Sequence, residues 1–132
     1  MSHVLDIVTA VIRDDRGRML LVRKRGTTTF MKPGGKRDDG EDDLTTLARE
    51  LDEELGCRLV SAELLGPFSA SAANEAGFTV RSATYLALVE GDIDARAEIE
   101  ELAWIDPAAP PAGMALAPLL KDEVIPALLA LA

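Results

Sequence analysis

Three glutamates in the first half of the chain could bind a metal ion. If their segment is helical, Glu50, Glu53 and Glu54 share one face, because they are three and four residues apart. Like charges at these spacings destabilise a helix by roughly 0.2–0.5 kcal/mol per pair. The adjacent Arg49 cannot neutralise all three carboxylates. A hard divalent cation, Mg²⁺ or Mn²⁺, can do so, since it prefers oxygen ligands.

A solvated acidic face is the alternative explanation, and the residues before the glutamates argue against it. Pro33, Gly34 and Gly35 predict a tight turn in which bare backbone can approach a ligand. An acidic cluster, accessible backbone and flanking cations together are typical of a site that binds a metal ion and a phosphate. The positively charged residues that flank the turn are Arg23, Arg25, Lys32, Lys36 and Arg37.

Several other catalytic chemistries are excluded by the rarest residues. The chain contains one histidine, His3, and one cysteine, Cys57. Nucleophilic Ser-His-Asp and Cys-His systems need a well-placed histidine, and His3 lies in a terminal segment. A structural zinc site needs about four Cys or His ligands. A single cysteine rules out an internal disulfide and fits a reducing compartment, so a cytoplasmic location is expected.

Length and charge limit the classes of partner. A chain of 132 residues with an apolar fraction of 48% predicts one domain over residues 1–132. The net charge of −9 disfavours binding to nucleic-acid polymers. No apolar run reaches the roughly 20 residues that cross a membrane, and the N-terminus lacks the features of a secretion signal. We therefore expect neither a nucleic-acid polymer nor a membrane as partner, and leave a homodimer open.

One helix is predicted strongly. Apolar residues at Leu44, Leu47, Leu51 and Leu55 form a single stripe over residues 42–55. The helix is expected to begin at the N-cap Asp42 and to stop at Gly56. A second, Ala/Leu-rich helix is expected from Leu116, with Pro118 in its first turn and a kink or break at Pro126.

Strands are predicted around this helix. Residues 4–13 and 18–25 flank an Asp/Gly turn and predict a hairpin, in which Arg23 and Arg25 share one face. Further strands are expected over 58–69, 78–90 and 98–105, with a polar loop over 69–77.

Residues 35–57 resemble the signature of the Nudix hydrolases, Gly-x5-Glu-x7-Arg-Glu-U-x-Glu-Glu-x-Gly-U, where U is a bulky apolar residue. Leu51 fills the first U position, and Cys57 stands at the second, where Ile, Leu or Val is usual. The resemblance implies an α+β Nudix fold, with a mixed β-sheet sandwiched between α-helices. All seven fixed positions agree: Gly35, Glu41, Arg49, Glu50, Glu53, Glu54 and Gly56.

The resemblance also implies a reaction and a role for each residue of the signature. Nudix hydrolases cleave a diphosphate linkage in a nucleoside diphosphate joined to another group X, with Mg²⁺ or Mn²⁺ as cofactor. Glu53 and Glu54 resemble the main metal ligands, and Glu50 a further ligand or the base that deprotonates the attacking water. Arg49 resembles the residue that orients the glutamates, and Glu41 a supporting residue at the start of the helix.

Further metal ligands are implied outside the glutamate cluster. The carbonyl of Gly34 commonly adds a ligand in this family, and a later acidic residue, Glu98 or Glu101, resembles another. In a regular strand Glu101 would share the buried face with Ile99. If Glu98 belongs to the preceding loop, it can turn to the metal without burying a charge, so we favour Glu98.

Four residues are candidate substrate contacts. Arg23, Arg25 and Lys36 could bind phosphate, although a solvated strand face explains the two arginines equally well. Phe30 lies beside the site and either contacts a nucleobase or packs in the core.

The substrate stays open at this stage. The proline typical of ADP-ribose hydrolases would lie near Ala72, and the tyrosine of dinucleoside-polyphosphate hydrolases near residues 73–75; neither is present. The short chain is similar in size to MutT-type enzymes, so we favour conversion of a nucleoside triphosphate to a monophosphate. ADP-ribose or a nucleotide sugar is the alternative. A non-catalytic nucleotide-binding module is a third hypothesis, although such modules usually lose a signature glutamate.

Overall fold

The computed structural model describes residues 3–71 and 77–131. The positions near Ala72, and most of the loop predicted over 69–77, lie outside the described residues. In chain order the elements are β1 (His3–Ile12), β2 (Met19–Lys24), β3 (Phe30–Met31), β4 (Gly34–Lys36), α1 (Asp43–Leu55), β5 (Arg58–Ser71), β6 (Phe78–Glu90), β7 (Ile99–Ile105), the π-helical turn η1 (Leu119–Val124) and α2 (Ile125–Leu129).

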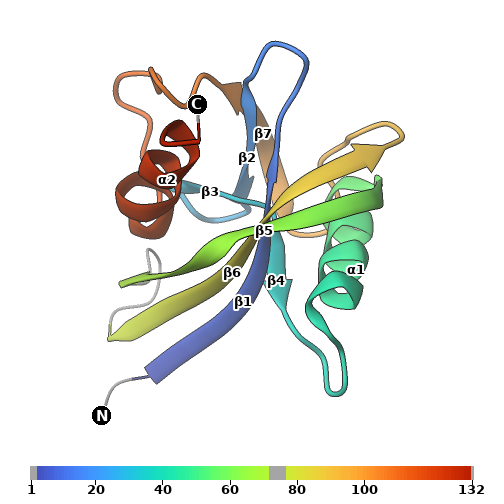
Figure 1. Cartoon of the computed structure of the whole chain (residues 1–132). Helices are drawn as coiled ribbons and strands as arrows, with labels where there is room; N and C mark the ends of the chain where they lie inside the picture. Colours follow the sequence, from blue (N-terminus) through green and yellow to red (C-terminus); the bar gives the residue numbers. More distant parts are fainter. Residues whose placement is uncertain (1–2, 72–76, 132) are drawn as a thin grey trace.

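The strands form two sheets that diverge from a common centre (Figure 1). One has the order β4-β1-β6-β5, and the other the order β3-β2-β7. Strands β1 and β6 run parallel, and the other pairs are antiparallel. The expected mixed β-sheet is therefore confirmed.

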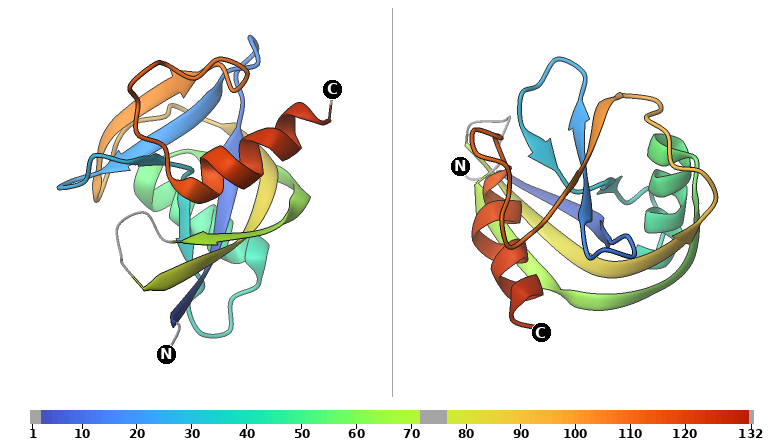
Figure 2. Two further views of the ribbon diagram at one scale, coloured as in Figure 1. Left: turned by 90° about the vertical axis from the view of Figure 1, so that its left-hand side faces the viewer. Right: turned by 90° about the horizontal axis from the view of Figure 1, so that it is seen from above.

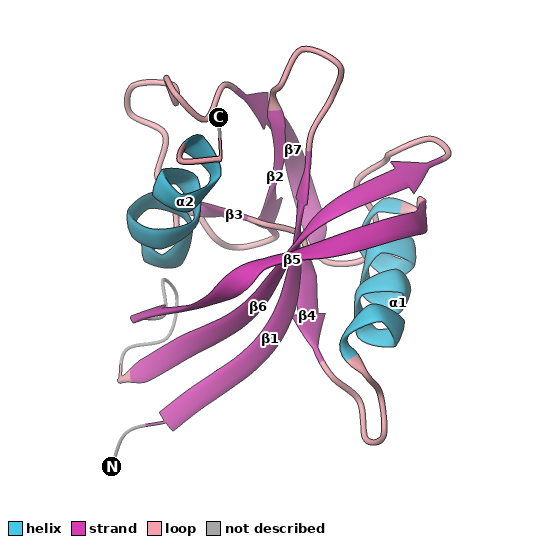
Figure 3. Cartoon of the chain, viewed as in Figure 1, coloured by secondary structure: helices cyan, strands magenta, loops and turns pink. Residues whose placement is uncertain are grey.

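Helices cover both sides of the strands, as expected for a sandwich (Figures 2 and 3). Helix α1 packs through Leu47, Leu51 and Leu55 against one face, where the even-numbered residues of β1 lie. The C-terminal segment η1–α2 packs on the other face, next to Val11. Successive side chains of a strand point to opposite faces, so β1 contributes to both core clusters.

Helix α1 follows the predicted boundaries closely. The Asp42 side chain accepts a hydrogen bond from the backbone N–H of Thr45, as an N-cap does. Gly56 ends the helix with φ of 72°, a left-handed conformation that glycine adopts without a Cβ clash.

The first two strands do not form the predicted hairpin, although the predicted turn between them is present. Asp14 and Arg18 close the turn, and Arg13 pairs with Met19 in an isolated bridge. The two strands then separate: β1 pairs with β4 and β6, and β2 pairs with β3 and β7. Both strands are buried on both faces, so each gains more apolar contact as a central strand of its own sheet.

The C-terminal helix changes type near Pro126. Residues 119–124 form the π-helical turn η1 and residues 125–129 form α2. Pro126 has no backbone N–H to donate, which fits the change in hydrogen-bond pattern at this point. No helix of the described residues is long and apolar enough to span a membrane.

Candidate active site

A cavity of about 640 Å³ opens between helix α1, the β3–β4 segment and the start of η1. One end is polar and includes all three glutamates of α1. The other end is largely apolar. The acidic and glycine residues of the lining are Gly34, Gly35, Glu50, Glu53, Glu54 and Glu98; the apolar side chains include Leu5, Ile7, Val80, Pro118, Leu119 and Leu120.

Glu54 is the most buried acid of the cavity. It is 7% exposed, and its carboxylate accepts a hydrogen bond of 3.0 Å from the backbone N–H of Gly34. Burial raises the pKa of Glu54 to about 7, and the nearby charges of Glu50 and Glu98 act in the same direction, while Lys24 opposes them. A cation bound here would relieve both the burial and the repulsion.

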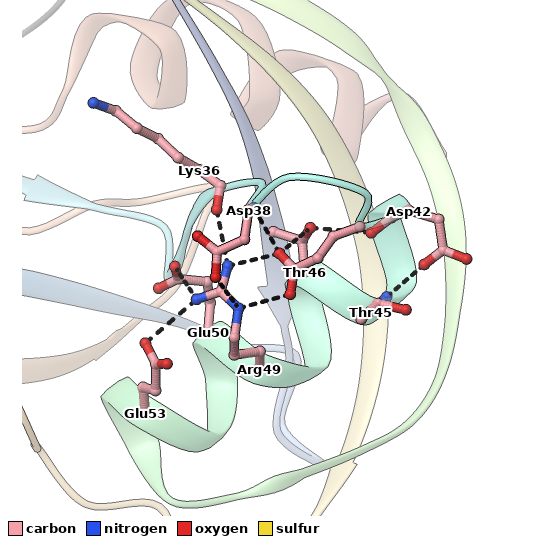
Figure 4. Close-up of polar contacts among 9 residues, drawn as sticks. Lys36, Asp38, Asp42, Thr45, Thr46, Arg49, Glu50 and Glu53 are labelled. Carbon is pink, nitrogen blue, oxygen red and sulfur yellow. Dashed lines mark hydrogen bonds and ion pairs between the residues drawn. The ribbon is translucent and has the colours of Figure 1, made fainter.

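Arg49 holds the surrounding carboxylates in place (Figure 4). Its guanidinium donates two hydrogen bonds of 2.8 Å to Glu41 and one of 2.9 Å to Glu50. It also reaches the carbonyl of Lys36 at 3.0 Å and, more loosely, Glu53 at 3.5 Å. Hydrogen bonds from Arg49 lower the pKa of Glu41 to about 2, so Glu41 stays ionised. The geometry fits the bracing role expected for Arg49 and the supporting role expected for Glu41.

The double glycine allows the loop to approach the helix closely. A Cβ at Gly35 would lie 2.5–2.8 Å from the carboxylate atoms of Glu50, and a Cβ at Gly34 would lie 2.1 Å from the carbonyl oxygen of Val8. Gly34 also has a φ of 141°. A side chain at Gly34 would therefore push β4 away from β1, and one at Gly35 would displace the carboxylate of Glu50. The glycines bring backbone next to the glutamates, as the sequence predicted.

The later acidic residues are separated by a β-bulge. Arg23 pairs with Glu101 and Lys24 with Ile99, so Glu100 is an extra residue in β7. The bulge breaks the alternation assumed for a regular strand. Ile99 is buried, while the Glu101 side chain is 52% exposed and forms an ion pair with Arg23 at 2.9 Å. Glu98 lies in the turn before β7 and lines the cavity.

The predicted basic contacts lie in different places. Arg25 and Lys36 line the cavity, whereas Arg23 is not among its lining residues and bonds to Glu101 and to the carbonyl of Thr27. The expectation that Arg23 and Arg25 share one binding face is therefore wrong, because Arg25 lies beyond the end of β2 and next to the bulge. Lys24 lines the cavity instead, because alternation in β2 places it on the face of Leu20 and Val22, which faces α1.

Phe30 packs in the core, which is one of the two alternatives that the sequence left open. Its side chain is 8% exposed, in the cluster with Val11, Leu21 and Leu119. Its backbone bonds to Ala115 and Ala117, which ties β3 to the C-terminal segment. Phe30 does not line the cavity, so its expected contact with a nucleobase is not supported.

The cavity wall includes two polar residues, Lys32 and Thr9, that the sequence did not single out as substrate contacts. Lys32 is 6% exposed, and its Nζ donates a hydrogen bond of 2.7 Å to the hydroxyl of Thr9. Burial lowers the pKa of Lys32 to about 7. The sequence placed Lys32 only among the cations that flank the turn, and a lysine in a predicted loop is usually solvated, so no local signal indicated its burial.

The carboxylates of the cavity are suitable ligands for a divalent cation, although their oxygens do not converge on one point. Glu50, Glu53, Glu54 and Glu98 offer only carboxylate oxygens, the ligands that Mg²⁺ and Mn²⁺ prefer. As placed, no three acidic, Cys or His side chains of residues 3–71 and 77–131 converge closely enough to hold an ion. Glu53 is 52% exposed and only loosely bonded to Arg49, so its side chain is free to turn toward Glu54.

Comparison with known proteins identifies the family. The NUDIX domain matches residues 4–128. An 8-oxo-dGTP diphosphatase of Haemophilus influenzae is 33% identical over 71 residues, which cover 51% of this chain and 52% of that protein. A MutT-like protein of Streptomyces ambofaciens is 36% identical over 66 residues, which cover 50% of this chain and 42% of that protein. The chain thus matches about half the length of these curated relatives.

Solved structures show the same fold. A MutT NUDIX hydrolase from Burkholderia pseudomallei superposes with a TM-score of 0.73 at 28% identity, covering 86% of this chain and 91% of that one. The E. coli ORF135 protein gives a TM-score of 0.77 at 25% identity, covering 98% and 91%. The chain therefore belongs to the NUDIX family of hydrolases, whose members act on phosphoric anhydride bonds and generally use divalent metal ions.

Proposed function

We propose that this protein is a Mg²⁺-dependent pyrophosphohydrolase that cleaves the diphosphate linkage of a small nucleoside diphosphate-X substrate. The observation that carries the proposal is the buried Glu54, which shares one cavity with Glu50, Glu53 and Glu98. Carboxylates so close together are costly without a cation, and the adjoining apolar end of the cavity offers room for the nucleoside. Mn²⁺ is expected to replace Mg²⁺, since both prefer oxygen ligands.

Each residue of the acidic end has a proposed role. Glu53, Glu54 and Glu50 hold the cation together with the carbonyl of Gly34 and the carboxylate of Glu98. A cation held by these residues would neutralise the phosphates, polarise a phosphoryl oxygen and lower the pKa of a bound water.

The remaining polar groups act on geometry and charge. Arg49, fixed by Glu41, holds Glu50 at 2.9 Å and so keeps it oriented as a ligand or as the base for the attacking water. Arg25 and Lys36 lie in the cavity wall, where they can bind the phosphate oxygens of the transition state. Arg23 is not proposed as a phosphate contact, because its guanidinium is bonded to Glu101.

A nucleoside triphosphate is the substrate that we favour, with water attack giving a nucleoside monophosphate and pyrophosphate. The similarity to an 8-oxo-dGTP diphosphatase supports this choice. A nucleotide joined to a different group X, such as ADP-ribose or a nucleotide sugar, is the second candidate. It is supported by 39% identity over 57 residues to "Nucleoside diphosphate-linked moiety X motif 6" of Xenopus laevis, of which those residues cover 26%.

A screen of nucleotides with Mg²⁺ tests the proposal. Products are separated by chromatography, and phosphate is counted with and without added pyrophosphatase. Phosphate that appears only with pyrophosphatase identifies pyrophosphate as the product. Glu54→Gln should reduce the activity by about 10²-fold. Glu123→Gln, at an exposed position outside the cavity, is the matched control. Binding of nucleotides without any turnover would instead identify a non-catalytic module.

Two expectations about the whole protein stay predictions: a single domain over residues 1–132 and a cytoplasmic location. A homodimer stays an open possibility, and size-exclusion chromatography with light scattering measures the oligomeric state directly.

A further inference from the structure

Lys32 is buried in a position where lysines are uncommon. It lies between β3 and β4, is 6% exposed and lines the cavity. Among the described residues, the hydroxyl of Thr9 is its hydrogen-bond partner, and burial alone accounts for its lowered pKa. A buried amine that also lines a cavity is a candidate for recognising a ligand, because an unpaired donor inside a protein is costly.

The groups behind Lys32 leave part of its hydrogen-bonding capacity unused. Thr9, Ser82 and Thr84 form a closed cluster, with oxygen–oxygen distances of 2.7, 3.2 and 3.0 Å. These hydroxyls can donate to one another while Thr9 also accepts from Lys32. An ammonium group carries three N–H donors, so further donors of Lys32 remain for a ligand in the cavity.

Lys32 stands between the two ends of the cavity. Thr9 pairs across β1 and β4 with Gly34, whose N–H holds Glu54. In the other direction along the same face of β1, Ile7 and Leu5 lie about 7 and 13 Å from Thr9 at ordinary strand spacing. Both line the apolar end, where Val80 lies beside Leu5 on β6. A substrate with its phosphates at Glu54 would place a flat base over this apolar floor and its polar edge toward Lys32.

We propose that Lys32 is a specificity-determining residue, which donates a hydrogen bond to a keto oxygen of the nucleobase. This inference rests on the proposed nucleotide substrate. A base with an amino group at the same ring position would direct N–H donors at the amine of Lys32. The charged form of Lys32 has no lone pair to accept from those donors, so the site would disfavour that base.

Two pairs of nucleotides differ at this ring position and, with it, in whether the neighbouring ring nitrogen carries a proton. Inosine and adenosine triphosphates carry a keto or an amino group at the same ring carbon, and so do uridine and cytidine triphosphates. We expect the wild type to prefer the keto member of at least one pair by tenfold or more in kcat/KM. Lys32→Met, which keeps length and removes the donors, should reduce that preference to below threefold. Lys121→Met, at an exposed position outside the cavity, is the control and should leave it unchanged.

Thr9→Val provides a second variant that does not depend on the folding of Lys32→Met. It removes the oxygen that orients the amine and should lower the keto preference by about threefold to tenfold. Equal use of both members of both pairs by the wild type would overturn the inference, and so would a preference that persists in Lys32→Met. If Lys32 contacted a phosphate oxygen instead, the wild type would use both members of each pair equally, because both members carry the same phosphates.

Calorimetric binding of the corresponding monophosphates separates this inference from the proposed function. If no nucleotide is hydrolysed, but the wild type binds the keto monophosphate tenfold more tightly and Lys32→Met does not, the hydrolase is refuted and the role of Lys32 stands. If neither binding nor turnover distinguishes the pairs, the role of Lys32 is refuted whatever the enzyme does.

Discussion

Around Arg49, carboxylates lie in a network of hydrogen bonds at the rim of the cavity, whereas Glu54 and Lys32 lie deeper and have few partners. The consequences for two glutamates of the same signature are opposite. Arg49 lowers the pKa of Glu41 to about 2, and burial raises the pKa of Glu54 to about 7. Burial lowers the pKa of Lys32 from its ordinary value of 10.5 to about 7, so both groups have a pKa near neutral pH. The network fixes geometry, and burial determines which groups change charge near neutral pH.

Removal of the divalent cation should have the largest effect on the acidic end. We expect EDTA to reduce hydrolysis by at least about 10³-fold, because the cation supplies several kcal/mol of transition-state stabilisation. Mg²⁺ or Mn²⁺ added in excess should restore the rate. Full activity in metal-free buffer would show that Arg49, Arg25 and the lysines suffice, and the role of the glutamates would need revision.

Substitution of single glutamates comes next. Glu53→Gln and Glu54→Gln keep the shape of the side chain and remove one charge from the site. Each should reduce kcat/KM by about 10²-fold, the scale expected for losing one group that stabilises the transition state. Glu63→Gln, on the exposed side of β5, is the control. A variant that keeps its specific activity but melts far below the wild type would identify a structural residue instead.

The burial of Glu54 should also be visible in stability without any cation. Its pKa of about 7 in the folded protein exceeds the ordinary value of 4.5, so the folded state binds the proton more tightly. Ionisation of Glu54 is therefore unfavourable for folding: the cost is absent below pH 4.5, grows up to pH 7 and is complete above it. In EDTA at pH 8, Glu54→Gln should increase the free energy of unfolding by about 2 kcal/mol, which is less than the full shift implies because the buried amide needs a partner.

Chemical denaturation across pH 5–8 measures this difference. The gain should shrink as the pH falls, and Mg²⁺ should favour the wild type. A gain that is constant with pH would mean that burial does not perturb Glu54.

The smallest expected effect is a change in the Mg²⁺ requirement, which should differ between substitutions of Glu98 and Glu101. Glu98 lines the cavity, and Glu101 pairs with Arg23 on the exposed side of the bulge. Glu98→Gln should raise the Mg²⁺ concentration for half-maximal rate by about threefold to tenfold, since one carboxylate contributes a modest share of binding. Glu101→Gln is the matched variant and should leave it unchanged. The opposite pattern would show that the bulge does not determine which acid reaches the metal.

Local patterns predicted the helix and its boundaries well. The leucine stripe, the Asp42 cap and the stop at Gly56 are features of neighbouring residues, and the structure has them within one residue of the prediction. The position of Arg49 beside Glu53 follows from the i, i+4 helical spacing alone. The position of Glu41 beside Arg49 needed the family resemblance, since eight residues separate them across a turn.

Pairing between distant strands was not predictable in the same way. The turn at residues 14–17 is encoded locally, but the partners of β2 depend on β7, some 80 residues later in the chain. The bulge at Glu100 shifts the alternation by one residue, and a shift of one residue moves each side chain to the other face. This explains why Glu101 is exposed although Ile99 is buried. Regular alternation in β2 places Lys24 on the face of Leu20 and Val22, and Arg23 on the opposite face.

The sequence by itself determined the family, the helix that carries the glutamates and the kind of cation that they suit, because those depend on residue types at short, fixed spacing. Only the tertiary structure decided that Phe30 packs in the core, that Glu98 rather than Glu101 lines the cavity, and that Lys32 is buried there. These placements depend on which distant segments exclude water from a side chain, and a pattern of neighbours in the sequence carries no information about that exclusion.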